Sequence, residues 1–182
     1  MFKKLNISEI EEIYNTYMVS DFPENELKPL SHIKRMVTDK VCTCYALYEG
    51  NIVLSYAFLC EYDGYVLIDY LAVNPRFRGK GIGTKTLEFL KDKLGGKHIL
   101  VECEDIAFSV DESEKTIRQR RIAFYENSGF ILSQVKTNLF GVRYVILTYP
   151  KDDADILNGF KNVYSRMLSK ESFSKNLCVF SE

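Results

Sequence analysis

A short basic segment rich in glycine offers the clearest chemistry in this 182-residue sequence. In residues 76–83, Arg76, Arg78 and Lys80 alternate with glycines at positions 79, 81 and 83. A loop that only reverses the chain needs one or two glycines. Glycines spaced in this way let backbone N–H groups point inward at a helix N-terminus, where unpaired donors and the helix dipole favour an anion. The segment therefore predicts a phosphate-binding loop. The alternative is a flexible turn with solvated cations.

The spacing of these glycines excludes two common nucleotide loops. The phosphate loop of NTPases needs G-x-x-x-x-G-K-[ST], which the segment does not supply. The dinucleotide fingerprint G-x-G-x-x-G fails because Thr84 stands where a third glycine should follow Gly79 and Gly81. A pyrophosphate held by backbone amides remains the best fit.

Three carboxylates interrupt apolar strand-like stretches and are candidates for a general base. Asp69 lies two residues before Leu71, so the two share one face of a strand, and Glu102 and Glu104 share a face of "HILVECE". Burying a carboxylate without a partner is costly, so each needs a reason to be there. The alternative is a structural ion pair with an arginine of the following helix, namely Arg118, Arg120 or Arg121.

The five cysteines are odd in number and mostly sit among apolar residues. Cys42-x-Cys44 resembles half of a metal site, but the two histidines, His32 and His98, offer no second half at ligand spacing. We expect no metal and predict that the cysteines are small, reduced core residues of a cytoplasmic protein. A redox or metal protein that uses Cys42 and Cys44 is the alternative.

Length and composition predict one globular domain with a real core. The chain is 46% hydrophobic and 27% charged, and its formal charge of −1 argues against nucleic-acid binding by a basic surface. No apolar run follows Met1, and none is long enough to span a bilayer. We therefore expect a cytoplasmic protein with neither a nucleic-acid nor a membrane partner.

The elements ahead of the glycine loop follow from hydrophobic spacing and turn residues. A capping box at Ser8-x-x-Glu11 predicts a helix over residues 8–19, and a short helix follows through residues 33–37. Residues 42–73 predict three antiparallel strands joined by tight turns at Gly50-Asn51 and Asp63-Gly64.

The elements after the loop alternate between helix and strand. We predict a helix over residues 82–94 ended by Gly95-Gly96, a strand at 98–104, an exposed acidic loop at 105–115 and a helix at 116–128. Strands near 131–135 and 142–149 follow. Beyond Pro150, an apolar stripe from Ile156 to Leu168 predicts a further helix. The order is that of an α/β protein with a mixed sheet.

Two motifs in this order resemble those of one enzyme family. Residues 78–83, "RGKGIG", match the R/Q-x-x-G-x-G/A signature of the GNAT superfamily of N-acetyltransferases, after a strand that ends in Leu-Ala-Val. Residues 124–130, "FYENSGF", are similar to the later motif of that family, a helix with a tyrosine followed by a glycine-aromatic pair. The resemblance covers residues 1–150.

This resemblance implies a GNAT-like fold, a mixed and mostly antiparallel sheet flanked by helices. It implies a GNAT N-acetyltransferase domain at 1–150. Outside the resemblance, the apolar stripe beyond Pro150 predicts a C-terminal helical extension at 151–182 packed on that domain. The apolar stripe of the extension is either an intramolecular packing face, which we favour, or a dimer interface. The protein is thus expected to be a monomer or a homodimer.

The cofactor implied by the resemblance is acetyl-CoA. Its pantetheine arm is expected to pair, like an added strand, with the strand Leu71, Ala72 and Val73. Its pyrophosphate is expected on the backbone amides of the signature loop, that is Arg78, Gly79, Lys80, Gly81, Ile82, Gly83 and Thr84.

The resemblance also assigns catalytic roles. Tyr125 resembles the general acid of the family, with simple packing as the alternative, and the backbone N–H of Leu71 resembles the oxyanion donor. The base is Glu102, Asp69 or a water molecule. Arg118 and Arg121 depart from the family pattern of this helix, and either contact the 3′-phosphate of the cofactor or pair with acidic neighbours.

These observations predict an N-acetyltransferase that moves an acetyl group from acetyl-CoA to a primary amine. The alternative is a non-catalytic acyl-CoA-binding sensor or protein-interaction module. The acceptor, a small molecule or a protein amine, is not identified by the sequence.

Overall fold

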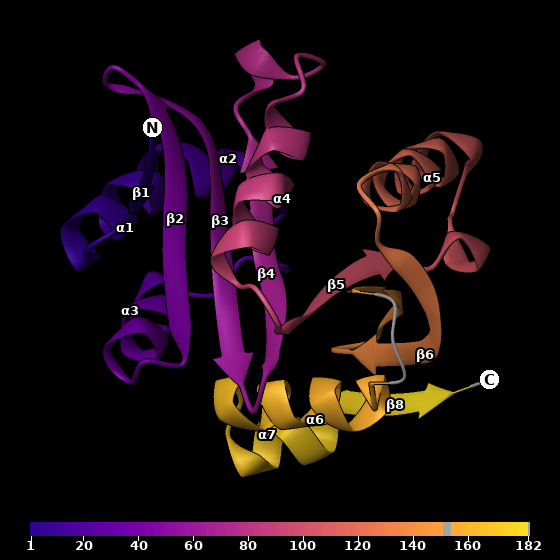
Figure 1. The fold of residues 1–182 in the computed structure, drawn as a ribbon. Helices are drawn as coiled ribbons and strands as arrows, with labels where there is room; N and C mark the ends of the chain where they lie inside the picture. Colours follow the sequence, from indigo (N-terminus) through magenta and orange to yellow (C-terminus); the bar gives the residue numbers. More distant parts are fainter. Residues whose placement is uncertain (151–153, 182) are drawn as a thin grey trace. The chain divides into compact units, whose positions relative to one another are not determined.

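The computed structural model describes residues 1–150 and 154–181 of the protein. In these residues, eight strands are hydrogen-bonded in the order β1-β2-β3-β4-β5-β7-β6-β8 (Figure 1). Contacts divide the chain into two compact units. Unit 1 comprises Met1–Cys60 and Asp69–Leu90, and unit 2 comprises Glu61–Ile68 and the chain from Lys91 onward. The boundary predicted near residue 150 is a different division and stays a prediction.

Four strands build the sheet of unit 1. They are β1 (Phe2–Lys4), β2 (Cys42–Glu49), β3 (Ile52–Tyr62) and β4 (Tyr65–Val73), whose first residues belong to unit 2. β1 pairs with β2, and β2 with β3, in antiparallel register. The predicted tight turns are confirmed, since Gly50 and Gly64 adopt the positive φ angles that such turns need. Sequence analysis missed the three-residue strand β1.

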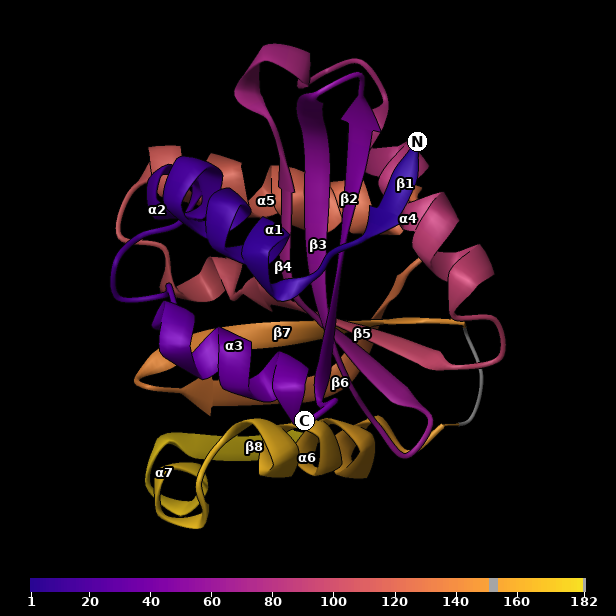
Figure 2. The ribbon, with the colours of Figure 1, turned by 90° about the vertical axis from the view of Figure 1, so that its left-hand side faces the viewer.

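The helices of unit 1 cover both faces of its strands. They are α1 (Ile7–Ile13), the π-helical turn η1 (Tyr14–Met18), α2 (Val19–Asp21), α3 (Leu30–Thr38), the 3₁₀ turn η2 (Pro75–Phe77) and α4 (Ile82–Lys93). Figures 1 and 2 show α1 to α3 on one face and α4 on the other. The predicted Ser8-Glu11 capping box is wrong. The side chain of Asn6 accepts a hydrogen bond from the N–H of Glu9, and the Glu9 carboxylate accepts one from the N–H of Asn6. Asn6 is therefore the N-cap, and the helix begins at Ile7.

Side chains of alternating strand residues fill the two layers of unit 1. On the α4 face, the ring of Phe89 stacks on Phe2 with centroids 3.9 Å apart and meets Tyr45 edge-on. On the opposite face, Tyr56 and Ile10 are almost completely buried. This packing fixes α4, and with it the glycine loop that leads into the helix.

The strands of unit 2 make the sheet mixed. They are β5 (His98–Glu104), β6 (Ile131–Leu139), β7 (Val142–Tyr149) and β8 (Leu177–Ser181). β5 runs parallel to β4 over Tyr65–Ile68, whereas the pairs β5–β7, β6–β7 and β6–β8 are antiparallel. The predicted mixed, mostly antiparallel sheet flanked by helices is therefore confirmed.

The helices of unit 2 lie on two sides of its strands, with α5 above and α6 below them in Figure 1. They are the 3₁₀ turn η3 (Ile106–Phe108), α5 (Glu112–Asn127), α6 (Ile156–Met167) and α7 (Lys170–Asn176). The acidic loop predicted at 105–115 is only partly right, because Asp111 caps α5 through the N–H of Glu114 and so starts the helix earlier. No described helix is both long and apolar enough to cross a bilayer.

The C-terminal helix predicted beyond Pro150 is confirmed as α6. Its apolar stripe is buried within the chain, with Phe160, Val163 and Tyr164 at most 1% exposed, so it is an intramolecular packing face. The extension holds two elements that the sequence did not predict, α7 and the edge strand β8, which pairs with β6.

Gly159 lets α6 approach Tyr65 closely. A Cβ added at Gly159 would lie 2.6 Å from Cγ of Tyr65 and closer still to two other ring atoms. Alanine normally stabilises a helix relative to glycine. Here we expect Gly159→Ala to lower the free energy of unfolding by about 1–2 kcal/mol, because overpacking forces the ring or the helix to shift. Thermal or urea unfolding measures this loss.

Gly95→Ala is the matched control for that substitution. An added Cβ at Gly95 meets only the Asp92 carbonyl oxygen, at an ordinary 3.6 Å. Its unfolding midpoint should stay close to the wild-type value. A Gly159→Ala protein as stable as wild type contradicts the close packing of α6 on Tyr65.

Candidate functional site

The glycine loop joins β4 to α4 within unit 1. Asn74 accepts the N–H of Arg76 and turns the chain into η2, after which Gly79 and Gly81 adopt φ angles of 73° and 74°. These left-handed conformations favour glycine. Within the described residues, the N–H groups of Gly79 to Thr84 donate no hydrogen bond to the protein. The loop thus presents a row of available donors at a helix N-terminus, as an anion site requires.

Arg78 is the cation of this loop that the fold fixes most firmly. Its Nε donates to the carbonyl oxygen of Val73 at 3.0 Å, and its Nη2 lies 3.6 Å from Oδ1 of Asp21. Asp21 in turn accepts a 2.7 Å hydrogen bond from the hydroxyl of Tyr56. The Arg78 side chain remains 60% exposed, so it is held in place and still open to a ligand.

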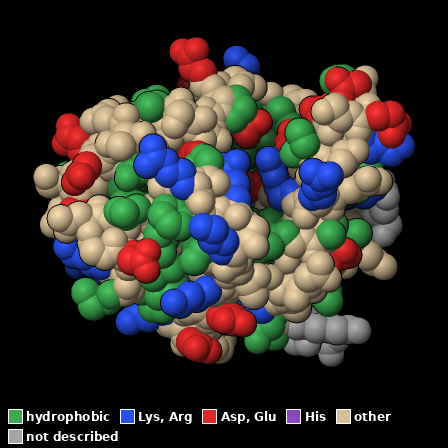
Figure 3. Space-filling model, turned by 90° about the horizontal axis from the view of Figure 1, so that it is seen from above, with side chains coloured by type: hydrophobic (Ala, Val, Ile, Leu, Met, Phe, Trp, Pro, Cys, Tyr) green, Lys and Arg blue, Asp and Glu red, His purple; other side chains and the backbone are tan. Residues whose placement is uncertain are grey.

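Asp21 is a residue that sequence reasoning missed at this loop. It follows the first helix by chain order, far from Arg78, and nothing in its spacing indicates the contact. Besides Arg78, the loop carries the cations Arg76 and Lys80, which are both exposed. The ammonium of Lys80 lies over the ring of Phe77. Figure 3 looks down on the end of Figure 1 where the loop lies, and Lys and Arg side chains are prominent there.

The strand ahead of the loop offers backbone groups beyond its ladder with β5. That ladder runs from Tyr65 paired with His98 to Ile68 paired with Val101, and Leu71, Ala72 and Val73 lie past its last pair. Ala72 is buried, whereas Leu71 and Val73 are partly exposed. Main-chain groups at such a strand can bind an extended ligand whatever its side chains.

Asp69, a predicted candidate for the base, lies in an ion pair. The ammonium of Lys28 contacts its Oδ1 at 2.7 Å, and the Asp69 side chain is only 4% exposed. The Tyr70 hydroxyl holds the same segment, since it donates to the carbonyl of Glu26 and accepts from the N–H of Lys28. Burial raises the pKa of Tyr70 to about 12. The Asp69 carboxylate is therefore engaged in a buried ion pair with Lys28.

Glu104 of unit 2 also pairs with cations. Its carboxylate lies 2.7 Å from Nη1 of Arg121 and 3.5 Å from Nη2 of Arg118. Arg118 is buried, and it further contacts Glu114 at 2.7 Å and the carbonyl oxygen of Asp105. Both arginines therefore pair with acidic neighbours. For Glu104, the predicted structural ion pair with an arginine of the following helix is confirmed.

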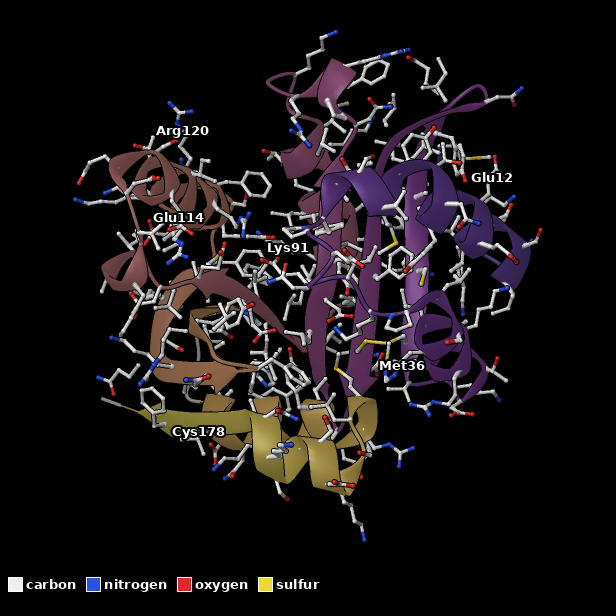
Figure 4. The ribbon with its side chains drawn as sticks, turned by 180° about the vertical axis from the view of Figure 1, so that it is seen from behind. Glu12, Met36, Lys91, Glu114, Arg120 and Cys178 are labelled. Carbon is white, nitrogen blue, oxygen red and sulfur yellow. A yellow bond between two sulfur atoms is a disulfide. The ribbon has the colours of Figure 1, made fainter. Side chains whose placement is uncertain are left out.

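Glu102 has a different partner. The hydroxyl of Tyr164, on α6, donates to Oε2 of Glu102 at 2.5 Å. Arg120, one predicted partner of the strand carboxylates, is exposed on the outer side of α5 (Figure 4). Sequence reasoning missed Tyr164, because the C-terminal extension lay outside the resemblance.

Tyr125 is packed on α5 among aromatic side chains. Its ring meets Phe130 edge-on at 5.6 Å and Phe124 at 5.0 Å. Burial, with a further effect of Cys103, raises the pKa of Tyr125 well above that of a free tyrosine. Among the described residues its hydroxyl has no hydrogen-bond partner. The group is thus a protonated donor without a structural hydrogen bond to satisfy.

The prediction of five reduced cysteines is wrong for two of them. Cys42 and Cys60, paired in the register of β2 and β3, are joined by a disulfide. Burial raises the pKa of the Cys44 thiol, so it offers no ready thiolate beside them. Over residues 1–150 and 154–181, no three His, Cys, Asp or Glu side chains gather as metal ligands do. Cys42 is therefore bonded to Cys60 and is not paired with Cys44 as the alternative of a redox or metal site required.

Comparison with protein families finds a match to the acetyltransferase (GNAT) domain over residues 40–132. Among curated proteins, YjbC of Bacillus subtilis (strain 168), provisionally named as an acetyltransferase, is 29% identical over 157 residues. The match covers 80% of this chain and 76% of YjbC.

Solved structures with the same fold include three acetyltransferases. A provisionally assigned GNAT-family protein from Bacteroides thetaiotaomicron has a TM-score of 0.68 at 23% identity. The match covers 86% of this chain and 90% of the Bacteroides chain. The ribosomal-protein-S18-alanine N-acetyltransferase from Escherichia coli has a TM-score of 0.60 at 17% identity, covering 86% and 96%. A GNAT-family enzyme from Elizabethkingia anophelis, solved with acetyl-CoA bound, has a TM-score of 0.55 at 14% identity, covering 81% and 95%. At these identities the likeness establishes the fold.

Proposed function

The chain belongs to the GNAT acetyltransferase family, and from this premise we propose that it transfers the acetyl group of acetyl-CoA to a primary amine. The observation that carries the proposal is the row of available N–H groups from Gly79 to Thr84 at the start of α4. A pyrophosphate carries the negative charge and the several acceptor oxygens that such a row of donors favours. Relatives with the same fold, solved with acetyl-CoA bound, support the choice of co-substrate.

In this proposal unit 1 binds the co-substrate. The amides from Gly79 to Thr84 hold the pyrophosphate, whereas Arg78, whose own N–H donates to Pro75, adds the positive charge of its tethered guanidinium beside them. The backbone of Leu71, Ala72 and Val73 pairs with the pantetheine arm as an added strand. Acetyl-CoA supplies the activated acetyl group, and the protein supplies its orientation.

Acetyl transfer to an amine makes three chemical demands. The acceptor must lose a proton before it attacks, the tetrahedral oxyanion needs a donor, and the departing thiolate benefits from a proton. We assign the oxyanion donor to the backbone N–H of Leu71 and the acid to Tyr125. We assign the base to Glu102, because Lys28 neutralises Asp69 and two arginines hold Glu104.

We place the protein in the cytoplasm, without a nucleic-acid or membrane partner, and as a monomer or homodimer. The intracellular co-substrate supports that location. The Cys42–Cys60 disulfide argues against it, because cytoplasmic proteins seldom keep such bonds. Counting free thiols in protein purified without reductant measures how much of the bond forms.

An amine panel tests the proposed reaction against the alternative of a non-catalytic acyl-CoA sensor. Purified protein is incubated with acetyl-CoA and each amine, and free CoA thiol is followed by a colorimetric assay. Thiol release that depends on the acceptor supports the enzyme, and mass spectrometry of the product locates the acetyl group. Tight acetyl-CoA binding without release across small amines, polyamines and protein N-termini contradicts it.

Gly81→Val tests the loop assignment. A Cβ at Gly81 meets no protein atom within 4 Å, so the added side chain chiefly blocks an approaching ligand, although its φ of 74° also strains valine. We expect acetyl-CoA affinity to fall by at least about thirtyfold, or about 2 kcal/mol. Isothermal titration calorimetry measures it.

Gly50→Val is the control for strain in that experiment. Gly50 also has a positive φ and open space around a built Cβ, but it lies in the β2–β3 turn of unit 1. The Gly50→Val protein should be less stable than wild type but should bind acetyl-CoA with unchanged affinity. Wild-type affinity in a folded Gly81→Val protein refutes the loop as the pyrophosphate site.

A further inference from the structure

The hydroxyl of Tyr164 donates to Oε2 of Glu102 at 2.5 Å, and so links the C-terminal extension to a candidate for the base. We propose that Tyr164 is a positioning residue, which orients the Glu102 carboxylate and favours its ionised form. The inference rests on the proposed function, in which Glu102 takes a proton from the acceptor amine. It also gives the extension a role in the reaction besides packing.

Tyr164 is itself held firmly in unit 2. The residue is 1% exposed, and its ring packs against Phe160 with centroids 4.8 Å apart. Five residues earlier on α6, Gly159 brings the helix against Tyr65. The hydroxyl therefore reaches Glu102 from a rigid element, which is what the orientation of a base requires.

The chemistry of a hydroxyl donor suits a base better than that of a cation. A hydrogen bond to the charged form of a carboxylate favours that form. The bond joins a hydroxyl donor to a carboxylate oxygen, and hydrogen bonds to an ionised acceptor are stronger than neutral ones. The tyrosine hydroxyl is a neutral donor, whereas the contacts given for Asp69 and Glu104 are with an ammonium and with two guanidiniums.

Several ionisable groups surround Glu102 and bear on its titration. Cys103 follows it on β5, and burial raises the pKa of that thiol to about 12, so it stays neutral at working pH. The register of β5 and β7 places Tyr144 opposite Glu104, on the face that Glu102 shares. Among the described residues these groups include Cys103 and Glu104 on β5, Tyr144 on β7, Tyr164 on α6, and Arg118 and Arg121 on α5 through Glu104.

Tyr164→Phe removes the hydroxyl and keeps the ring. We expect kcat/KM at neutral pH to fall by about tenfold, because a hydrogen bond to a charged group is lost. Without the donor the carboxylate binds a proton more readily, so the acidic limb of the pH–rate profile should move to higher pH and activity should recover there. The KM for acetyl-CoA should not change, since Tyr164 is not assigned to its binding.

A double variant separates positioning from packing. If Tyr164 acts through Glu102, adding Tyr164→Phe to Glu102→Gln should cost no further activity. Tyr65→Phe is the matched control, because its ring packs on the same helix at Gly159 and the change also removes a single hydroxyl. It should leave the acidic limb in place. Thermal melts on each variant exclude loss of folded protein as the cause.

A second readout does not depend on turnover. In protein labelled with ¹³C in the glutamate carboxyls, Glu102→Gln identifies the Glu102 resonance, and its titration midpoint should rise in Tyr164→Phe. The inference is overturned if the Glu102 titration midpoint or the pH–rate profile does not move in Tyr164→Phe, or if the losses of activity add in the double variant. In each of these cases an active wild type still supports the proposed function. A wild type that releases no CoA thiol with any amine overturns both.

Discussion

Replacing Glu102 by glutamine should lower acetyl transfer at neutral pH by about 10²-fold, the low end of the range for general acid–base catalysis. The amide keeps the shape of the side chain and can still accept the Tyr164 hydroxyl, but it cannot take a proton. Much of the rate should return at high pH, where free amine is abundant. A pH–rate profile with an acceptor found in the amine panel measures both effects.

Glu104→Gln is the matched control for that experiment. Glu104 lies two residues on in β5, and its carboxylate holds Arg118 and Arg121. Its loss leaves the buried Arg118 without one of its partners, so the unfolding midpoint should fall. The acidic limb of the profile should remain where it is. A stable Glu102→Gln enzyme with an unaltered profile excludes Glu102 as the base, and Asp69 would be tested next.

Tyr125→Phe should lower turnover by about 10²-fold with little change in acetyl-CoA affinity. The hydroxyl is needed only as the thiolate leaves, and a thiolate is a fair leaving group, so the low end of the range applies. Burial raises the pKa of Tyr125, which keeps the acid protonated to higher pH than a free tyrosine. Its deprotonation should therefore add no loss of rate between neutral and mildly alkaline pH.

Tyr149→Phe controls for the aromatic packing around Tyr125. Both tyrosines flank the ring of Phe130, at 5.6 Å and 5.7 Å, and each substitution removes one hydroxyl from the same cluster. Single-turnover measurements separate the chemical step from product release. If Tyr125→Phe and Tyr149→Phe both turn over at the wild-type rate, Tyr125 only packs and its role as acid is lost.

Hydrophobic periodicity and turn residues predicted most of the fold. The strong signals were the paired turns at 50–51 and 63–64, the glycine loop and the stripe of α6, since each depends on neighbours in sequence. The extension of β6 and the strands β1 and β8 were missed. They are stabilised by partners far along the chain, and β1 is only three residues long.

The disulfide shows how one residue decides such a pairing. From the turn at 50–51, Glu49 pairs with Ile52 and Tyr48 with Val53, but a bulge then pairs Leu47 with Ser55. Without that extra residue Cys42 would face Leu59 instead of Cys60. The sequence marks the turn clearly and the bulge not at all, so the bond could not be foreseen.

The candidate site was predictable where it is built from local sequence. The loop from Arg78 to Thr84 and the motif around Tyr125 were both visible as short patterns. The partners that distinguish the three carboxylates were not, since Lys28, Arg121 and Tyr164 reach them from other elements. Choosing among candidate bases required those distant contacts.

The division of β4 between the two units matters while the chain is being synthesised. Val66, Leu67 and Ile68 are at most 5% exposed in the finished fold, and their parallel partner, β5, begins only at His98. The ribosome makes them some thirty residues, or a few seconds, before that partner, at about 5–20 residues per second. During this interval an apolar hairpin tip has an uncovered edge of the kind that chaperones bind and that aggregates. A fragment ending at Leu90 would keep that edge uncovered, so soluble pieces of this protein have to include β5.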